Sequence, residues 1–325
     1  MGQKSKVSGV ILIDKPKGLT SQQVVSKVKY LLKSPLHDSK KAGHTGTLDP
    51  MATGLLPVCL GEATKFSHYQ LDADKSYQAT IKLGVQTDTG DADGQSIAEQ
   101  EIPNISIEDL KQITAQFLGN IKQTPPMYSA LKKEGKKLYE YARAGIEVER
   151  EARPITIKEM SLQLTALKDE LLLNVTCTKG TYVRVLGEDI ALALHTLGHL
   201  NSLRRTQVGH FLIAEAISLN ELERLTHEQR LAQLQPIDAC VTGLPALTVF
   251  ENQRQRLMMG QRLNVKEQLS DELVEYLSGA DKTIDKDLNA QQSCDIKIIT
   301  TEGDFLGLGE LELNGRLQPK KMIQR

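Results

Sequence analysis

Apolar residues recur along the chain with two interleaved periods. Gly9 to Ile13 is a continuous apolar run that predicts a buried strand. Ser21 suits the N-cap of a following helix whose single apolar face is formed by Val24, Val25, Val28, Leu31 and Leu32. The segment 34–47 predicts a loop. The run 55–60 predicts an edge strand rather than a helix, because Pro57 cannot donate to a ladder.

The middle of the chain mixes the strand and helix periods. Residues 77–85 alternate as a half-buried strand does, and a turn-rich loop follows them. Segments 154–164 and 170–178 predict paired strands, whereas 107–118 and 182–197 have helical spacing. Because there is no strict βαβ rhythm, we expect an α+β fold with a mainly antiparallel mixed sheet flanked by helices.

The amino-acid composition of the chain changes near residue 240. Proline and glycine gather between residues 236 and 245, which favours a linker, and short apolar runs separated by glycine then predict a small β-barrel. We therefore expect a domain of residues 1–247 and a second domain of residues 248–325. The polar, acidic stretch 266–293 is long for such a barrel and indicates an insertion or a mobile loop.

Composition narrows the class of protein. The 325 residues carry 40 Lys and Arg against 41 Asp and Glu, for a net charge of −1. This balance argues against a cationic coat but allows a local basic groove. No apolar run approaches the roughly 20 residues that cross a bilayer, and no signal peptide is visible, so we expect a cytoplasmic protein with no membrane partner. The four cysteines form no CxxC pair, which argues against a local zinc site or a disulfide framework.

One loop carries the most specific chemistry, GHTGTLDPMATGLLPVCLGEATK at residues 43–65. Its glycines permit backbone conformations that are closed to other residues. Asp49 precedes Pro50, which pushes it toward an extended conformation from which a carboxylate can face a ligand. The residues alone leave another interpretation open, since Asp-Pro is also common in turns.

This loop resembles the catalytic motif of the TruB-type tRNA pseudouridine synthases, GHxGxLDPxATGxLPxxxGxATK, at every fixed position. Further segments that resemble the family are KPKGLTS at 15–21, KSY at 75–77, TDTGD at 87–91, QTPPMYSALK at 123–132, GTYVR at 180–184 and LRRT at 203–206. The tail resembles the family's small RNA-binding PUA domain. The resemblance therefore covers most of the chain.

The resemblance implies a pseudouridine-synthase fold and an enzyme that isomerises uridine in the T-loop of tRNA, at position 55. It implies that Asp49 is catalytic, either as a nucleophile or as a base on the sugar. A base inside folded RNA must be flipped out before its glycosidic bond can be reached. The resemblance also implies that no cofactor or metal is needed, and that a monomer binds tRNA without an obligate protein partner.

The resemblance names five substrate-binding residues. It assigns Tyr77 to stacking on the flipped base and Arg184 to pairing with the catalytic carboxylate. His44 and Tyr182 are expected to contact the substrate, and Leu203 to line the base pocket. Without the resemblance, the two tyrosines and the leucine would be interpreted as packing residues. A cation in the first turn of a helix, as Arg184 is expected to be, is unfavourable without a partner.

Basic residues from separate segments would neutralise phosphates if the fold collects them along one cleft. Alone, each predicts a solvated surface charge. The candidates for contacts with the RNA backbone are Lys15, Lys17, Lys132, Arg204 and Arg205, and further lysines are Lys40, Lys41, Lys133, Lys136 and Lys137.

Other functions fit these residues less well. An RNA-guided relative that acts on ribosomal RNA would be longer and carry basic tails, and a non-catalytic tRNA-folding protein would not need the set of Asp49, Tyr77 and Arg184. A glycosidase-like hydrolase would need a second carboxylate as an acid. His195 and His199 have metal-ligand spacing but lack a third ligand, and no glycine-rich nucleotide motif is present.

Overall fold

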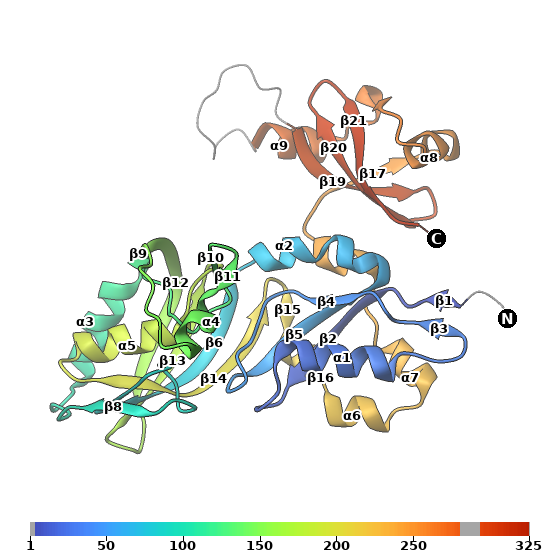
Figure 1. Cartoon of the computed structure of the whole chain (residues 1–325). Coiled ribbons are helices and arrows are strands. Elements are labelled where there is room, and N and C mark those ends of the chain that lie inside the picture. The colour runs from blue at the N-terminus through green and yellow to red at the C-terminus, as the bar shows by residue number, and fades with distance from the viewer. Residues whose placement is uncertain (1–3, 280–292, 325) are drawn as a thin grey trace.

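The structure is a computed structural model that describes residues 4–279 and 293–324. Two sheets with their helices divide the described chain into a larger and a smaller body (Figure 1). The strands of the larger sheet are β2 (Gly9–Lys15), β4 (Ala42–His44), β5 (Thr53–Leu60), β6 (Lys75–Leu83), β9 (Gly119–Gln123), β12 (Arg153–Leu164), β13 (Glu170–Cys177), β14 (Gly198–Val208), β15 (Phe211–Leu212) and β16 (Ile217–Ser218).

The larger sheet runs in the order β16-β2-β5-β14-β6-β13-β12-β9, with β4 beside β5 and β15 beside β14. The pairs β5–β14 and β2–β16 are parallel, and the other neighbours in this sheet are antiparallel. This arrangement confirms the predicted α+β class with a mainly antiparallel mixed sheet.

The larger body also contains helices. They are α1 (Ser21–Leu31), α2 (Ser67–Asp72), α3 (Ile107–Phe117), α4 (Leu138–Arg143), α5 (Val183–Ala193), α6 (Leu219–Arg224) and α7 (His227–Ala232). α1 and α6 pack together beside β4 and β2, whereas α5 packs on β14 and β6 and α3 packs on β12 (Figure 1). Three short strand pairs complete the body: β1 (Ser5–Lys6) with β3 (His37–Asp38), β7 (Val85–Thr87) with β8 (Ser96–Glu99), and β10 (Lys132–Lys133) with β11 (Lys136–Lys137).

The apolar face predicted for α1 is confirmed, but the N-cap is Thr20 and not Ser21. Thr20 accepts from the Gln23 N–H at 3.2 Å, and the Gln23 side chain accepts from the Thr20 N–H at 2.8 Å, which forms a capping box. The Ser21 hydroxyl donates to the Leu48 carbonyl at 3.0 Å and accepts from the Leu48 N–H at 2.8 Å. The start of α1 therefore holds the residue that precedes Asp49.

β5 is an interior strand, which corrects the expectation of an edge strand. β2 pairs with most of its length, and on the other side the pairing passes from β14 at Thr53 and Gly54 to β4 at Val58. Pro57 falls in the gap between these two partners, so its missing N–H interrupts neither ladder. The predicted loop 34–47 also contains two strands, β3 and β4, which are too short to show a period.

Two elements end earlier than their sequence patterns suggest. The strand that contains Tyr77 stops at Leu83, because Gly84 at φ +87° separates β6 from β7. α5 ends at Ala193, since His195 adopts the left-handed region at φ +62°. The middle helix and the paired strands are confirmed to within one residue, as α3, β12 and β13.

The smaller body contains a five-stranded sheet in the order β17-β19-β20-β21-β18. Its elements are β17 (Ala246–Val249), α8 (Glu251–Met258), β18 (Leu263–Asn264), α9 (Asp271–Gly279), β19 (Ser293–Thr300), β20 (Phe305–Glu312) and β21 (Arg316–Met322). The short strands predicted for the tail are therefore present. α9 occupies part of the acidic stretch 266–293, of which residues 280–292 lie outside the described residues.

The two bodies pack through a shared apolar cluster. The rings of Phe66 and Phe305 meet edge to face with centroids 5.3 Å apart, and Leu308 and Ile323 are buried in the same cluster. The segment predicted as a linker joins this cluster, because the 3₁₀ helix Ile237–Val241 buries its last three residues. The smaller body is thus docked on the larger one rather than tethered to it.

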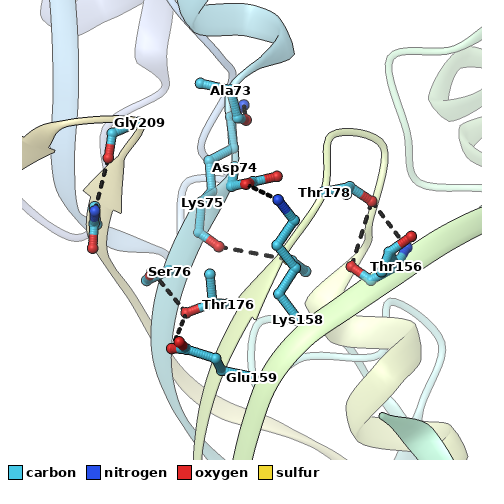
Figure 2. A network of polar contacts seen from close by, with 12 residues as sticks. Ala73, Asp74, Lys75, Ser76, Thr156, Lys158, Glu159, Thr176, Thr178 and Gly209 are labelled. Carbon is cyan, nitrogen blue, oxygen red and sulfur yellow. Dashed lines mark hydrogen bonds and ion pairs between the residues drawn. The ribbon is translucent and has the colours of Figure 1, made fainter. Parts of the chain in front are cut away.

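Polar contacts fix the start of β6 to its neighbours, as Figure 2 shows. Ser76 on β6 and Thr176 on β13 share a hydrogen bond at 3.0 Å. Lys158 on β12 pairs with Asp74, just before β6 begins. Three strands are therefore tied together next to Tyr77.

Candidate active site

Asp49 lies on the loop between β4 and β5, and backbone contacts hold this loop on both sides of the residue. Leu48 is fixed by α1, as described above. The Ala52 N–H donates to the Asp49 carbonyl at 3.1 Å, and the Gly18 N–H donates to the Pro50 carbonyl at 2.8 Å. The Asp49 side chain nevertheless stays 39% exposed, so a fixed backbone presents an accessible carboxylate.

Arg184, in the first turn of α5, meets this carboxylate. Its side chain is 5% exposed, and its Nε lies 3.0 Å from Asp49 Oδ2. The two terminal nitrogens donate to the carbonyls of Thr89 and Tyr128, both at 2.7 Å. Asp91 Oδ2 lies 3.7 Å from the same Nε. The guanidinium is thus held on every edge, and Asp49 meets a cation of fixed orientation.

Two supports of the site were missed by the sequence analysis. Asp91 is buried and accepts from the Thr89 hydroxyl at 2.6 Å, which places a second carboxylate beside Arg184. The side chain of Gln123 donates to the Tyr182 carbonyl at 3.1 Å and accepts from its N–H at 2.8 Å, so it fixes the start of α5. Both residues lie in segments that resemble the family, and this resemblance was the only signal that could have drawn attention to them. Hydrophobic periodicity is local, so it does not indicate that Asp91 and Gln123 contact residues near the start of α5.

The Asp49 charge acts on the hydroxyls of the two tyrosines predicted to bind the substrate, Tyr77 and Tyr182. Burial raises the pKa of the Tyr77 and Tyr182 hydroxyls, and the Asp49 charge acts in the same direction on both. Leu203 is 7% exposed and pairs across the strands with Ala79, so it faces the same side of the sheet as Tyr77. The Asp49 charge therefore acts on both hydroxyls, and Leu203 lies on the same sheet face as Tyr77.

His44 is half-buried at the end of β4, ahead of Asp49 in the same loop. Its Nδ1 accepts from the Gly46 N–H at 3.3 Å. Burial and the nearby Arg205 cation lower the pKa of His44, so its imidazole is neutral near pH 7. A neutral ring in this position suits stacking or a polar contact rather than charge pairing.

Two of the residues expected along the RNA backbone are buried instead, which corrects that part of the interpretation. Lys15 is fully buried, and its Nζ donates to the carbonyls of Leu19 and Pro50 at 2.7 and 3.4 Å. Burial lowers the pKa of Lys15 to about 8. Arg205 is 1% exposed, and its guanidinium donates to the Gly46 carbonyl of the loop that carries Asp49. Strand alternation turns both side chains inward, and a family motif does not reveal that direction.

The other basic candidates remain at the surface. Arg204 pairs with Asp14 through two bonds of 2.7 and 3.0 Å, and with Lys17 and Gln78 it lines a cavity of about 250 Å³. Lysines occupy both strands of the hairpin of β10 and β11, where Lys132 pairs with Lys137 and Lys133 pairs with Lys136. Of the remaining candidates, the exposed ones are Lys17, Lys40, Lys41, Lys132, Lys133 and Lys136.

In the described ranges, 4–279 and 293–324, no three His, Cys, Asp or Glu side chains gather as metal ligands. His199 Nδ1 lies instead 2.8 Å from the Val85 carbonyl. Among the helices of these ranges, none has the length and the apolar character that crossing a bilayer requires.

Solved structures place this architecture in a class. A "Cbf5-Nop10-Gar1 Complex" and an "H/ACA RNP bound to a substrate RNA containing 2'-deoxyuridine" superpose with TM-scores of 0.62 and 0.63. They share 24% and 22% sequence identity with this chain, over 94% and 98% of it and 79% and 85% of their own chains. The superposition shows that the chain has the pseudouridine-synthase fold.

Sequence comparison then gives the family. The model of the TruB family pseudouridylate synthase N-terminal domain matches residues 33–183, and two TruB C-terminal models match residues 184–242 and 245–323. The tRNA pseudouridine synthase B of Psychrobacter cryohalolentis is 60% identical over 99% of this chain and 95% of its own. That of Aromatoleum aromaticum is 46% identical over 99% and 94%. The chain belongs to the TruB family of pseudouridylate synthases, a family of isomerases.

Proposed function

We propose that this protein converts uridine to pseudouridine at position 55 in the T-loop of tRNA, with Asp49 as the catalytic carboxylate. The observation that carries the proposal is the pair of Asp49 and Arg184, an accessible carboxylate held 3.0 Å from a buried guanidinium. The names of the curated relatives support tRNA as the substrate class. The enzyme acts in the cytoplasm as a monomer, without a guide RNA or a protein partner.

The reaction breaks the bond between the ribose and N1 of uracil and joins the ribose to C5, which loses its proton while N1 gains one. An anionic oxygen beside the sugar serves this step either as a nucleophile or as a base, and both roles need an oriented carboxylate. Arg184 supplies the orientation, because carbonyls on two loops fix its guanidinium. Asp91, which is buried against that guanidinium, balances its charge and does not meet the substrate.

The target base is flipped out of the T-loop and enters between the two tyrosine-bearing segments. Tyr77 stacks on the base, since an aromatic face can hold a uracil that has lost its partners. Tyr182 and Leu203 exclude water from the detached base, and the neutral His44 ring contacts the RNA from the catalytic loop. The exposed lysines of the β10–β11 hairpin, with Lys17 and Arg204, bind phosphates.

The test is to incubate the protein with an unmodified tRNA transcript and map pseudouridine by nucleotide position. The proposal predicts one new pseudouridine, at position 55 of the T-loop, without added metal or cofactor. A matched transcript with cytidine at that position is expected to remain unmodified. Pseudouridine at another site, or none in the wild-type transcript, contradicts the proposal.

A further inference from the structure

Arg205 lies beneath the catalytic loop, and the proposed function gives it no role. Its side chain is 1% exposed. The Nε donates to the Leu55 carbonyl of β5 at 2.8 Å, and Nη2 donates to the Gly46 carbonyl of the loop at 3.1 Å. One guanidinium therefore bridges an interior strand and the loop segment between His44 and Asp49.

Two glycines lie against Arg205: Gly46 of the loop faces its side chain, and Gly54 of β5 faces its backbone. At Gly46, φ is +140° and an added Cβ would lie 3.4 Å from Arg205 Nη1. At Gly54, φ is +99° and an added Cβ would lie 2.3 Å from the Arg205 carbonyl oxygen. Neither backbone conformation accepts a side chain without strain, and at Gly54 the close approach of the Arg205 backbone leaves no room for one.

The charge of the same guanidinium acts on two aromatic side chains of the site, Tyr77 and His44. β14 pairs with β6 so that Arg205 lies opposite Tyr77 on the same face of the sheet. Burial raises the pKa of the Tyr77 hydroxyl, and the Arg205 charge acts in the opposite direction. Its charge also acts on His44, whose pKa is lowered first by burial and then by Arg205. Arg205 thus contacts or polarises both the stacking ring and the loop that bears the carboxylate.

We propose that Arg205 is a positioning residue that sets the separation between the Tyr77 ring and the Asp49 loop. A planar guanidinium donates in several fixed directions at once, which a lysine ammonium does not. Arg205 can therefore hold the carbonyls of Leu55 and Gly46 in one geometry at the position that lies opposite Tyr77. The inference rests on the proposed function for the reaction, whereas the contacts belong to the free protein.

The variants to compare are Arg205→Lys, which keeps the charge, and Arg205→Met, which removes it. Arg230→Lys is the matched control, because Arg230 also donates to three backbone carbonyls, of Leu31, Leu222 and Glu223, away from the site. Single-turnover rate, tRNA Kd, unfolding temperature and NMR titration of the histidines in the free protein are measured for each. The His44 signal is assigned with His44→Gln.

Arg205→Lys is expected to fold and to lose about tenfold or more in single-turnover rate, with a tRNA Kd close to that of the wild type. Arg205→Met is expected to lose about 10²-fold, the cost of a misplacement near 1 Å. The titration midpoint of His44 is expected to rise toward its ordinary value in Arg205→Met and to stay low in Arg205→Lys. Arg230→Lys is expected to change neither the rate nor His44.

Wild-type rates in both Arg205 variants would overturn the proposal. An equal loss of rate in Arg230→Lys would do so as well, and so would failure of both Arg205 variants to fold, because Arg205 would then serve the fold rather than the site. If the wild-type protein forms no pseudouridine, the proposed function fails separately. The His44 titration, which needs no RNA, then decides whether Arg205 governs the loop: an unchanged midpoint in Arg205→Met contradicts it.

Discussion

Replacing Arg184 with methionine removes the cation that joins the catalytic loop to the rest of the site. The substitution leaves the Asp91 carboxylate, which is 7% exposed, without its partner, and it frees the carbonyls of Thr89 and Tyr128. Loss of one member of a buried ion pair costs about 3–5 kcal/mol. The Asp49 side chain is 39% exposed, so water can solvate it after Arg184 is removed. We therefore expect the free energy of unfolding to fall by the lower end of that range, about 3 kcal/mol. For a chain of 325 residues, that corresponds to a fall in unfolding temperature of about 4–6 °C.

The same change is expected to slow the reaction by about 10²-fold, because Asp49 loses the group that fixes its direction. Thermal unfolding and single-turnover pseudouridine formation are measured on the same preparation. The double variant Arg184→Met with Asp91→Asn separates the two effects: stability is expected to return in large part, since the buried charge is gone, and turnover is not.

Arg230→Met is the control for Arg184→Met, because it also removes a guanidinium that donates to three backbone carbonyls, but outside the site. It is expected to lower stability and leave turnover unchanged. An Arg184→Met protein that unfolds at the wild-type temperature, or that turns over at the wild-type rate, refutes the reasoning.

Three further predictions follow from the contacts. Tyr77→Ala is expected to lose more turnover than stability, because the ring is only half-buried and its proposed role is to stack on the base; a large fall in melting temperature with normal turnover would favour a packing role. Thr20→Ala is expected to cost about 1 kcal/mol in urea unfolding through the lost capping box, and no measurable cost would show that this cap is not needed. Phe305→Ala is expected to cost about 3 kcal/mol and to expose the chain near residue 240 to limited proteolysis. Unchanged protease resistance would contradict the docking of the two bodies.

Much of the fold could be predicted because, in a long segment, the spacing of the apolar residues indicates both the type of element and the face that is buried. The apolar face of α1, the pairing of β12 with β13 and the short strands of the tail all follow from local patterns. The errors fall where tertiary contacts decide. Serine is a favourable N-cap residue, yet Thr20 is the N-cap of α1, and the Ser21 hydroxyl instead donates to the Leu48 carbonyl. Proline usually occurs on edge strands. Pro57 is tolerated inside this sheet because it lies between the segment of β5 that pairs with β14 and the segment that pairs with β4.

The candidate site was predicted as a set of residues but not as a geometry. The motif led to Asp49 and Arg184, and the structure brings them together. It could not show that Lys15 and Arg205 point inward, since alternation along a strand depends on which face the fold buries. Asp91 was present in a recognised segment, but its role depends on a contact across 93 positions of the chain to Arg184.

The most direct test of the account is Asp49→Asn, assayed for pseudouridine formation and for tRNA binding in parallel. The amide is nearly isosteric and can keep its place beside Arg184, so binding is expected to stay close to the wild-type value. Pseudouridine at position 55 is expected to fall below detection, because the amide has neither the charge nor the basicity of the carboxylate. Turnover at a rate near that of the wild type would contradict the central claim that this carboxylate carries the reaction.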